Sequence, residues 1–177
     1  SAGFEPEIQI SPAQDGWLLR SGYDLRFSRQ KDILELHWQV TEQSNAYPLK
    51  PALLWESLCE VPLLGKPVTR FTAETTALLL CLHGTKHQWQ KLKWIADLAM
   101  LAHRHPGLDW DELLEQARAL GFQRMLAVGL SLSERTMGLQ LPARVRTHIA
   151  ADPAVTRLTA LVWERTLLQR QSMETTD

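Results

Sequence analysis

The chain has 177 residues, of which 45% are hydrophobic and 22% are charged, and its formal net charge is -1. This length is sufficient for one domain or two small ones with a sizeable apolar core. A nearly neutral chain has no general attraction to nucleic acid or anionic lipid, which argues against a dedicated nucleic-acid-binding module.

No apolar run approaches the roughly 18 residues that cross a bilayer. The only cysteines, Cys59 and Cys81, lack zinc-finger or disulfide-framework spacing. We therefore expect a cytoplasmic protein with no membrane segment.

The first part of the chain predicts short elements of both kinds. Ser11-Pro12 provides an N-cap and a first turn for a short helix, which Ser21-Gly22 ends. Tyr23 to Phe27 alternates apolar and polar side chains, as a half-buried strand does, and a second strand is expected from Ile33 to Val40. These elements predict a small antiparallel sheet.

The segment from Thr41 to Arg70 is irregular and proline-containing. A short helix is expected to begin at Pro51, and Val61 to Thr69 has the turn residues of a small hairpin. From Thr72 onward the pattern is helical.

The later helices have clear end signals. Asp109 with Glu112 three residues later is typical of a capping box, and Gly121 and Gly138 follow the ends of helices. Asp152-Pro153 begins the last helix. The expected fold class is α+β, with a partial α+β portion at 1–70, a helical bundle at 71–171 and a loose tail at 172–177.

Leu78 to Leu101 contains an unusual number of polar groups between two apolar runs. On a single helix, one face would carry an apolar stripe. The adjacent stripe would hold His83, His87, Gln90, Trp94 and Asp97. Gly84 inside this helix costs about 1 kcal/mol relative to alanine, which favours a break or a close backbone approach near His83 to His87.

Glu35 and His37 lie two residues apart on the second predicted strand, so their side chains share one face. The simplest interpretation of such a pair is the solvent-facing side of an antiparallel hairpin. The spacing alone does not choose between this interpretation and a functional one.

Several short segments together resemble a bacterial family of uncharacterised nucleotidyltransferases, which is similar to the wider DNA polymerase β-like nucleotidyltransferase superfamily. The resemblance extends from about Gly3 to Pro142 and depends on the order of the segments, because each alone is weak. The matching segments are Leu34-Glu35-Leu36-His37-Trp38, Val61 to Val68, His83-Gly-Thr-Lys86-His87-Gln-Trp89, Leu92-Lys93-Trp94-Ile95-Ala96-Asp97-Leu98-Ala99 and Leu108-Asp109-Trp110.

The resemblance implies transfer of a nucleoside monophosphate from an NTP to an acceptor that the sequence does not identify. Enzymes of this kind use an Asp-x-Asp pair and a third acid to hold divalent cations, normally Mg²⁺, on the triphosphate. Glu35 aligns with the third acid and would be a metal ligand, and His37 lies beside it as a second catalytic residue. The residues expected to contact phosphates are His83, Lys86, His87 and Lys93, with Trp89, Trp94 and Asp97 in supporting roles.

The chain departs from this family in one important respect. It contains no Gly-Ser or Gly-Gly turn followed by an Asp-x-Asp strand, and the family has that part upstream of the position where this chain begins. We expect the chain to be the C-terminal portion of a longer enzyme. It would then be inactive alone, bind Mg²⁺ only with the missing acids, and interact with the missing N-terminal portion.

The same residues are also compatible with two different classes of protein. The large helical share and the missing acidic pair are equally typical of a non-catalytic helical interaction module. A metal hydrolase would need His37, His83 and His87 to converge, and their spacing does not predict this. In a non-catalytic module, Glu35 would be a solvated or ion-paired strand residue, Lys93 and Asp97 a helix ion pair, and the tryptophans core residues.

Overall fold

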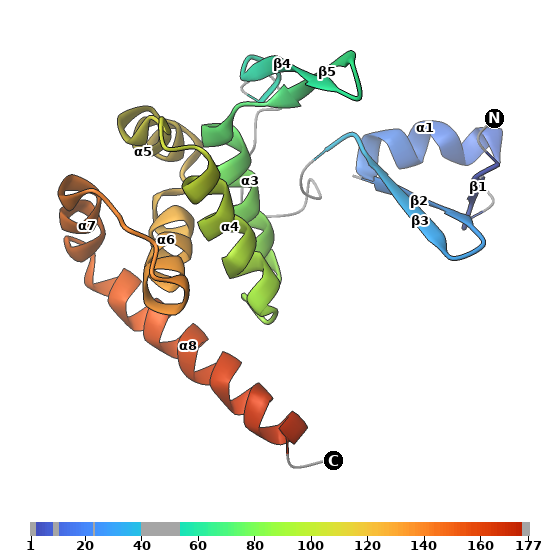
Figure 1. Cartoon of the computed structure of the whole chain (residues 1–177). Coiled ribbons are helices and arrows are strands. Elements are labelled where there is room, and N and C mark those ends of the chain that lie inside the picture. Colours follow the sequence, from blue (N-terminus) through green and yellow to red (C-terminus); the bar gives the residue numbers. More distant parts are fainter. Residues whose placement is uncertain (1–2, 9–10, 23, 40–53, 175–177) are drawn as a thin grey trace. The chain divides into compact units, whose positions relative to one another are not determined.

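The computed structural model describes residues 3–8, 11–22, 24–39 and 54–174. Within this part, seven α-helices and two small antiparallel sheets confirm the predicted α+β class. The chain divides into two compact units, Ser1–Leu53 and Leu54–Asp177 (Figure 1).

The first unit is a three-stranded antiparallel sheet with one helix. Its elements are β1 (Glu5–Pro6), α1 (Pro12–Ser21), β2 (Asp24–Arg29) and β3 (Asp32–His37), and the strand order is β1-β2-β3. The predicted ends of α1 are confirmed. The amide and hydroxyl of Ser11 both donate to Gln14 Oε1, at 3.1 and 2.8 Å, and Gly22 N donates to the carbonyl of Leu18 at 2.7 Å.

The two predicted strands form a hairpin through a two-residue turn. Arg29 pairs with Asp32, which leaves Gln30 and Lys31 in the turn, and Gln30 has a φ of 54°. Most side chains of β2 are half-buried, as the alternation predicts, but all six of β3 are exposed. Tyr23 and Val40, the outer ends of the predicted strands, lie outside the described residues.

The second unit begins with the predicted hairpin, β4 (Leu58–Leu63) and β5 (Lys66–Phe71). Leu64 and Gly65 form its turn with φ values of 51° and 78°, and Pro62 lies opposite Pro67. In Figure 1 this two-stranded ribbon extends from the N-terminal end of α3. Of the short helix expected from Pro51, residues 51–53 lie outside the described residues, Leu54 and Trp55 are helical, and Leu58 belongs to β4.

The remaining elements of the second unit are helices. They are α3 (Ala73–Lys86), α4 (Leu92–Arg104), α5 (Trp110–Leu120), α6 (Gln123–Met137), α7 (Ala143–Ala150) and α8 (Pro153–Glu174). Helices α3, α4 and α6 pack together and carry most of the buried apolar side chains. The buried Ser133 hydroxyl donates to the carbonyl of Ile95 at 3.3 Å and joins α6 to α4. Helix α8 extends three residues into the predicted tail.

The expectation of one continuous helix through Leu78 to Leu101 is wrong. Helix α3 ends at Lys86 and α4 begins at Leu92, because the chain turns where Gln88 and Trp89 both have a φ of 54°. The close approach expected at Gly84 is confirmed: its carbonyl accepts from Trp89 N at 2.7 Å, and an added Cβ would lie 2.5 Å from the Trp89 ring. The indole is only 2% exposed.

The predicted capping box at α5 is half correct. Asp109 Oδ1 accepts from the amides of Asp111 and Glu112, at 3.0 and 3.1 Å. The amide of Asp109, however, donates to Glu74 Oε1 of α3 at 3.0 Å instead of to Glu112. A tertiary contact therefore replaces the local one.

Candidate functional site

One face of the β1-β2-β3 sheet carries Glu35 and His37, as the alternation of side chains predicts. In the antiparallel register, Glu35 lies opposite Arg26, and His37 lies opposite Asp24. Side chains paired in this way lie on the same face of a sheet. The hairpin therefore brings four ionisable groups together.

Glu35 has a partner on each carboxylate oxygen. Arg26 donates to Oε1 through Nη2 at 2.5 Å and Nε at 3.1 Å, and His37 Nε2 lies 3.6 Å from Oε2. The hydrogen bond from Arg26, followed by the charge of the guanidinium, lowers the pKa of Glu35, and a smaller contribution comes from His37. The same carboxylate raises the pKa of Arg26. Glu35 is consequently ionised at neutral pH.

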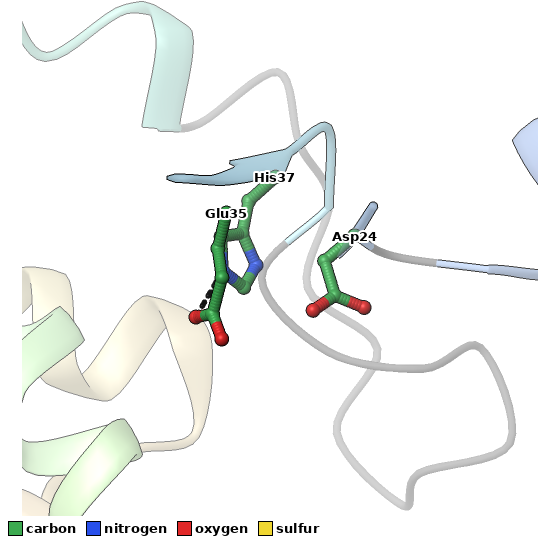
Figure 2. A group of neighbouring side chains, drawn as sticks. All are labelled: Asp24, Glu35 and His37. Carbon is green, nitrogen blue, oxygen red and sulfur yellow. Dashed lines mark ion pairs between the residues drawn. The ribbon is translucent and has the colours of Figure 1, made fainter. Parts of the chain in front are cut away.

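Asp24 completes a set of three possible metal ligands. One ligand atom from each of Asp24, Glu35 and His37 lies within 4.8 Å of the other two (Figure 2). Asp24 is half-buried, whereas the other two side chains are exposed. Asp24 cannot be identified by spacing along one strand, because its position depends on the cross-strand register. The two-residue turn between the strands is the sequence signal for that register.

The donor set is chemically suited to a divalent cation. Carboxylate oxygens are the ligands that Mg²⁺ prefers, and an imidazole nitrogen adds affinity for transition metals such as Mn²⁺. At metal–ligand distances of about 2.1 Å, adjacent ligand atoms lie about 3 Å apart and opposite ones about 4.2 Å apart. The separation of 3.6 Å between His37 Nε2 and Glu35 Oε2 lies between these two values. The two carboxylates and the imidazole thus fit such an ion.

The second unit holds the other group of predicted site residues at the end of α3 and the start of α4. The His83 ring centroid lies 4.6 Å from that of His87 and 5.3 Å from that of Trp94. His87 stacks on Trp94 at 5.1 Å, and Lys91 Nζ lies 5.8 Å from the centroid of the same indole. The turn between the helices therefore brings two imidazoles and an ammonium group together around one indole.

The predicted lysines belong to the same region, but the predicted ion pair does not form. Lys86 is the last residue of α3 and Lys93 the second residue of α4, and both are exposed. Among the described side chains, no ion pair joins Lys93 to Asp97. Trp89 is in the core, as expected for a structural residue. The Glu35 group and the His83 group belong to different compact units.

Comparison with known proteins places the chain among the nucleotidyltransferases. A family model described as an uncharacterised nucleotidyltransferase matches residues 1–138, which confirms the resemblance found in the sequence. The chain belongs to this nucleotidyltransferase family. No curated protein and no solved structure matches the chain significantly. None of the helices in the described part of the chain combines the length and apolar character that crossing a membrane requires.

Proposed function

We propose that this chain is the C-terminal portion of a cytoplasmic enzyme that transfers a nucleoside monophosphate from an NTP to an acceptor. The observation that carries the proposal is the family match over residues 1–138. The chain contains no Gly-Ser turn followed by an Asp-x-Asp strand, and its one Asp-x-Asp, at Asp109 and Asp111, lies at the start of helix α5. Under this proposal an N-terminal portion supplies those acids and contacts this one. The fragment alone would be inactive.

Under this proposal the polar face of the β1-β2-β3 sheet contributes to the metal site. Asp24 and Glu35 would hold Mg²⁺ through their carboxylates, with His37 as the neighbouring ligand or proton acceptor. A bound divalent cation neutralises charge on the triphosphate and orients the in-line attack. The grouping of Asp24, Glu35 and His37 on one face of the sheet supports this role.

A second part of the proposal concerns the turn between α3 and α4. His83, Lys86, His87 and Lys93 would contact phosphate oxygens, with the lysines acting as point charges. Three observations support it: the contact of both histidine rings with Trp94, the exposure of both lysines, and the position of Lys93 in the first turn of α4, where the helix dipole is positive.

The test uses the full-length gene product. Binding of ATP, GTP, CTP and UTP is measured by calorimetry with Mg²⁺ for the wild type and for Glu35→Gln, Asp24→Asn and Lys86→Gln. A matched control is Glu60→Gln on β4, outside the proposed site. We expect nucleotide affinity to fall at least about tenfold in the three site variants and to stay unchanged in the control. Equal binding by all variants, with no nucleotide incorporated into any acceptor, would reject the proposal.

One observation favours a non-catalytic interaction module instead. The ion pair with Arg26 satisfies Glu35 within this chain, so the carboxylate has a partner without any metal. This alternative predicts that the complete open reading frame also lacks a Gly-Ser turn followed by an Asp-x-Asp strand. The sequence upstream of Ser1 distinguishes the two proposals.

A further inference from the structure

A row of three charged side chains crosses the polar face of the sheet. Glu7, Arg26 and Glu35 lie on successive chain segments, with Arg26 paired to Glu35 in the register. The amide of Glu7 donates to the carbonyl of Arg26 at 2.9 Å, which continues the pairing of β1 with β2. The Arg26 guanidinium therefore lies between two carboxylates.

The two carboxylates hold the guanidinium unequally. Nη2 of Arg26 lies 2.5 Å from Glu35 Oε1, whereas Nε lies 4.0 Å from Glu7 Oε2. The Arg26 side chain is 52% exposed, and those of Glu7 and Glu35 are 37% and 40% exposed. Exposed ion pairs of this kind are weak and readily exchange partners.

This arrangement sets Arg26 in competition with any cation bound by Asp24, Glu35 and His37. The guanidinium occupies one oxygen of the same Glu35 carboxylate, and its positive charge repels a divalent ion at short range. Glu7 is an alternative partner for Arg26 and is not one of the three grouped ligands. Movement of the guanidinium toward Glu7 would release Glu35 without leaving Arg26 unpaired.

We infer that Arg26 occupies Glu35 when no divalent cation is bound and exchanges to Glu7 when one binds, so that Arg26 and Glu7 together set the affinity of the site. Arg26 is a positioning residue that acts through Glu35. The inference rests on the metal site of the proposed function. It adds a regulating pair of residues that are not metal ligands.

The test measures Mn²⁺ binding to the full-length gene product, which includes the expected N-terminal acids, by the electron paramagnetic resonance signal of free Mn²⁺. Arg26→Gln removes the competitor, so we expect about fivefold tighter binding. Arg26→Lys keeps the charge but loses the two-pronged hydrogen bond, so it should fall between Arg26→Gln and the wild type. Glu7→Gln removes the alternative partner and should weaken binding by about threefold.

A double-mutant cycle separates partner exchange from a general charge effect. If Glu7 acts through Arg26, Glu7→Gln changes affinity by less than about twofold in the Arg26→Gln background. A matched control is Arg29→Gln, on the same strand but on the opposite face and paired with Asp32 at 3.1 Å. This control should leave Mn²⁺ affinity within about twofold of the wild type.

Three results would overturn the inference. Equal Mn²⁺ affinity of wild type and Arg26→Gln would remove the role of Arg26 and leave the metal site intact. An equal effect of Glu7→Gln in both backgrounds would show a direct charge effect without exchange. Absence of Mn²⁺ binding in both the wild type and Arg26→Gln would remove the site from this chain, while nucleotide binding by the full-length product would still decide the proposed function.

Discussion

Glu35 is the side chain on which the candidate site depends, and two neighbours set its ionisation. The hydrogen bond from Arg26 is the largest cause of its lowered pKa. A glutamate in this environment stays ionised further into the acid range than an ordinary one. The carboxylate therefore keeps its ion pair with Arg26 at pH values where unperturbed carboxylates begin to protonate.

The ionisation of Glu35 predicts a pH-dependent effect of Glu35→Gln. Because the folded-state pKa lies below the unfolded-state value, the pair with Arg26 stabilises the fold at neutral pH, and this contribution is lost as the pH falls through the lowered pKa. We expect Glu35→Gln to lower the urea midpoint slightly at neutral pH, with a difference from wild type that disappears as the pH falls through the lowered pKa. Glu60→Gln serves as the control, and a difference that persists in acid would contradict the prediction.

Only some residues of the candidate site can be predicted from spacing along one strand. The shared face of Glu35 and His37 follows from the alternation of side chains along one strand. The contributions of Asp24 and Arg26 require the pairing of two strands, which spacing within one strand does not specify. Glu7 is further removed, because β1 has only two residues and no alternating pattern predicts it.

At the scale of elements, the β4–β5 hairpin has an unfavourable residue in its turn. Leu64 has a φ of 51° and a side chain that is 97% exposed, so it bears the steric cost of a left-handed conformation without any packing. Asparagine adopts this conformation readily and forms the preferred Asn-Gly turn. Leu64→Asn should raise the free energy of unfolding by about 0.5–1 kcal/mol, measured by urea titration.

The neighbouring Leu63 provides the control for this prediction. It is 60% exposed and lies in β4 instead of the turn. Leu63→Asn removes a similar apolar surface but places a poor strand former in the strand, so it should give no gain. Equal stabilisation by both substitutions would attribute the effect to lost surface hydrophobicity instead of turn geometry.

The α3–α4 corner depends on the absence of a side chain at Gly84. An alanine in a helix normally stabilises by about 1 kcal/mol relative to glycine. At Gly84, however, the Cβ would lie 2.5 Å from the buried Trp89 ring. We expect Gly84→Ala to lower the free energy of unfolding by about 1–3 kcal/mol, as overpacking does.

Gly107→Ala is the matched control for Gly84→Ala. No atom lies within 4 Å of an added Cβ at this position, and the backbone is outside the left-handed region. Its effect on urea unfolding should be below about 0.5 kcal/mol. Equal effects of the two substitutions would mean that the Trp89 contact is unimportant.

The same corner shows why a continuous helix is the wrong expectation. The apolar stripe of Leu78 to Leu101 continues in phase across the turn, so periodicity does not reveal the break. The two residues with left-handed backbone are Gln88 and Trp89, and neither is a residue that usually marks a turn. Only Gly84 indicates the corner, through the close approach that it permits.

At the scale of the whole molecule, the buried side chains are concentrated in one of the two units. Every described residue classed as buried lies in Leu54–Asp177, and none lies among the described residues from 3 to 39. Burial of apolar surface is the main source of stability. The second unit should therefore be much more stable than the first.

Amide hydrogen exchange measures this difference directly. We expect amides in the centre of α6 to exchange at least about 100-fold more slowly than hydrogen-bonded amides of β2 and β3. Equal protection of both would show that the first sheet is stabilised by contacts beyond those of its own unit. Repeating the measurement on the full-length product tests whether an N-terminal portion protects the sheet.

The turn at Gln30-Lys31 has a consequence for how this site can vary. Its two residues determine which side chains of β2 and β3 oppose each other. One inserted residue would shift the pairing by one position and direct Asp24 and Glu35 to opposite faces, although every ligand would still be present. The length of this turn is therefore a requirement for the candidate site. A homologue that keeps all three ligands but has a longer turn should not be assumed to keep the site.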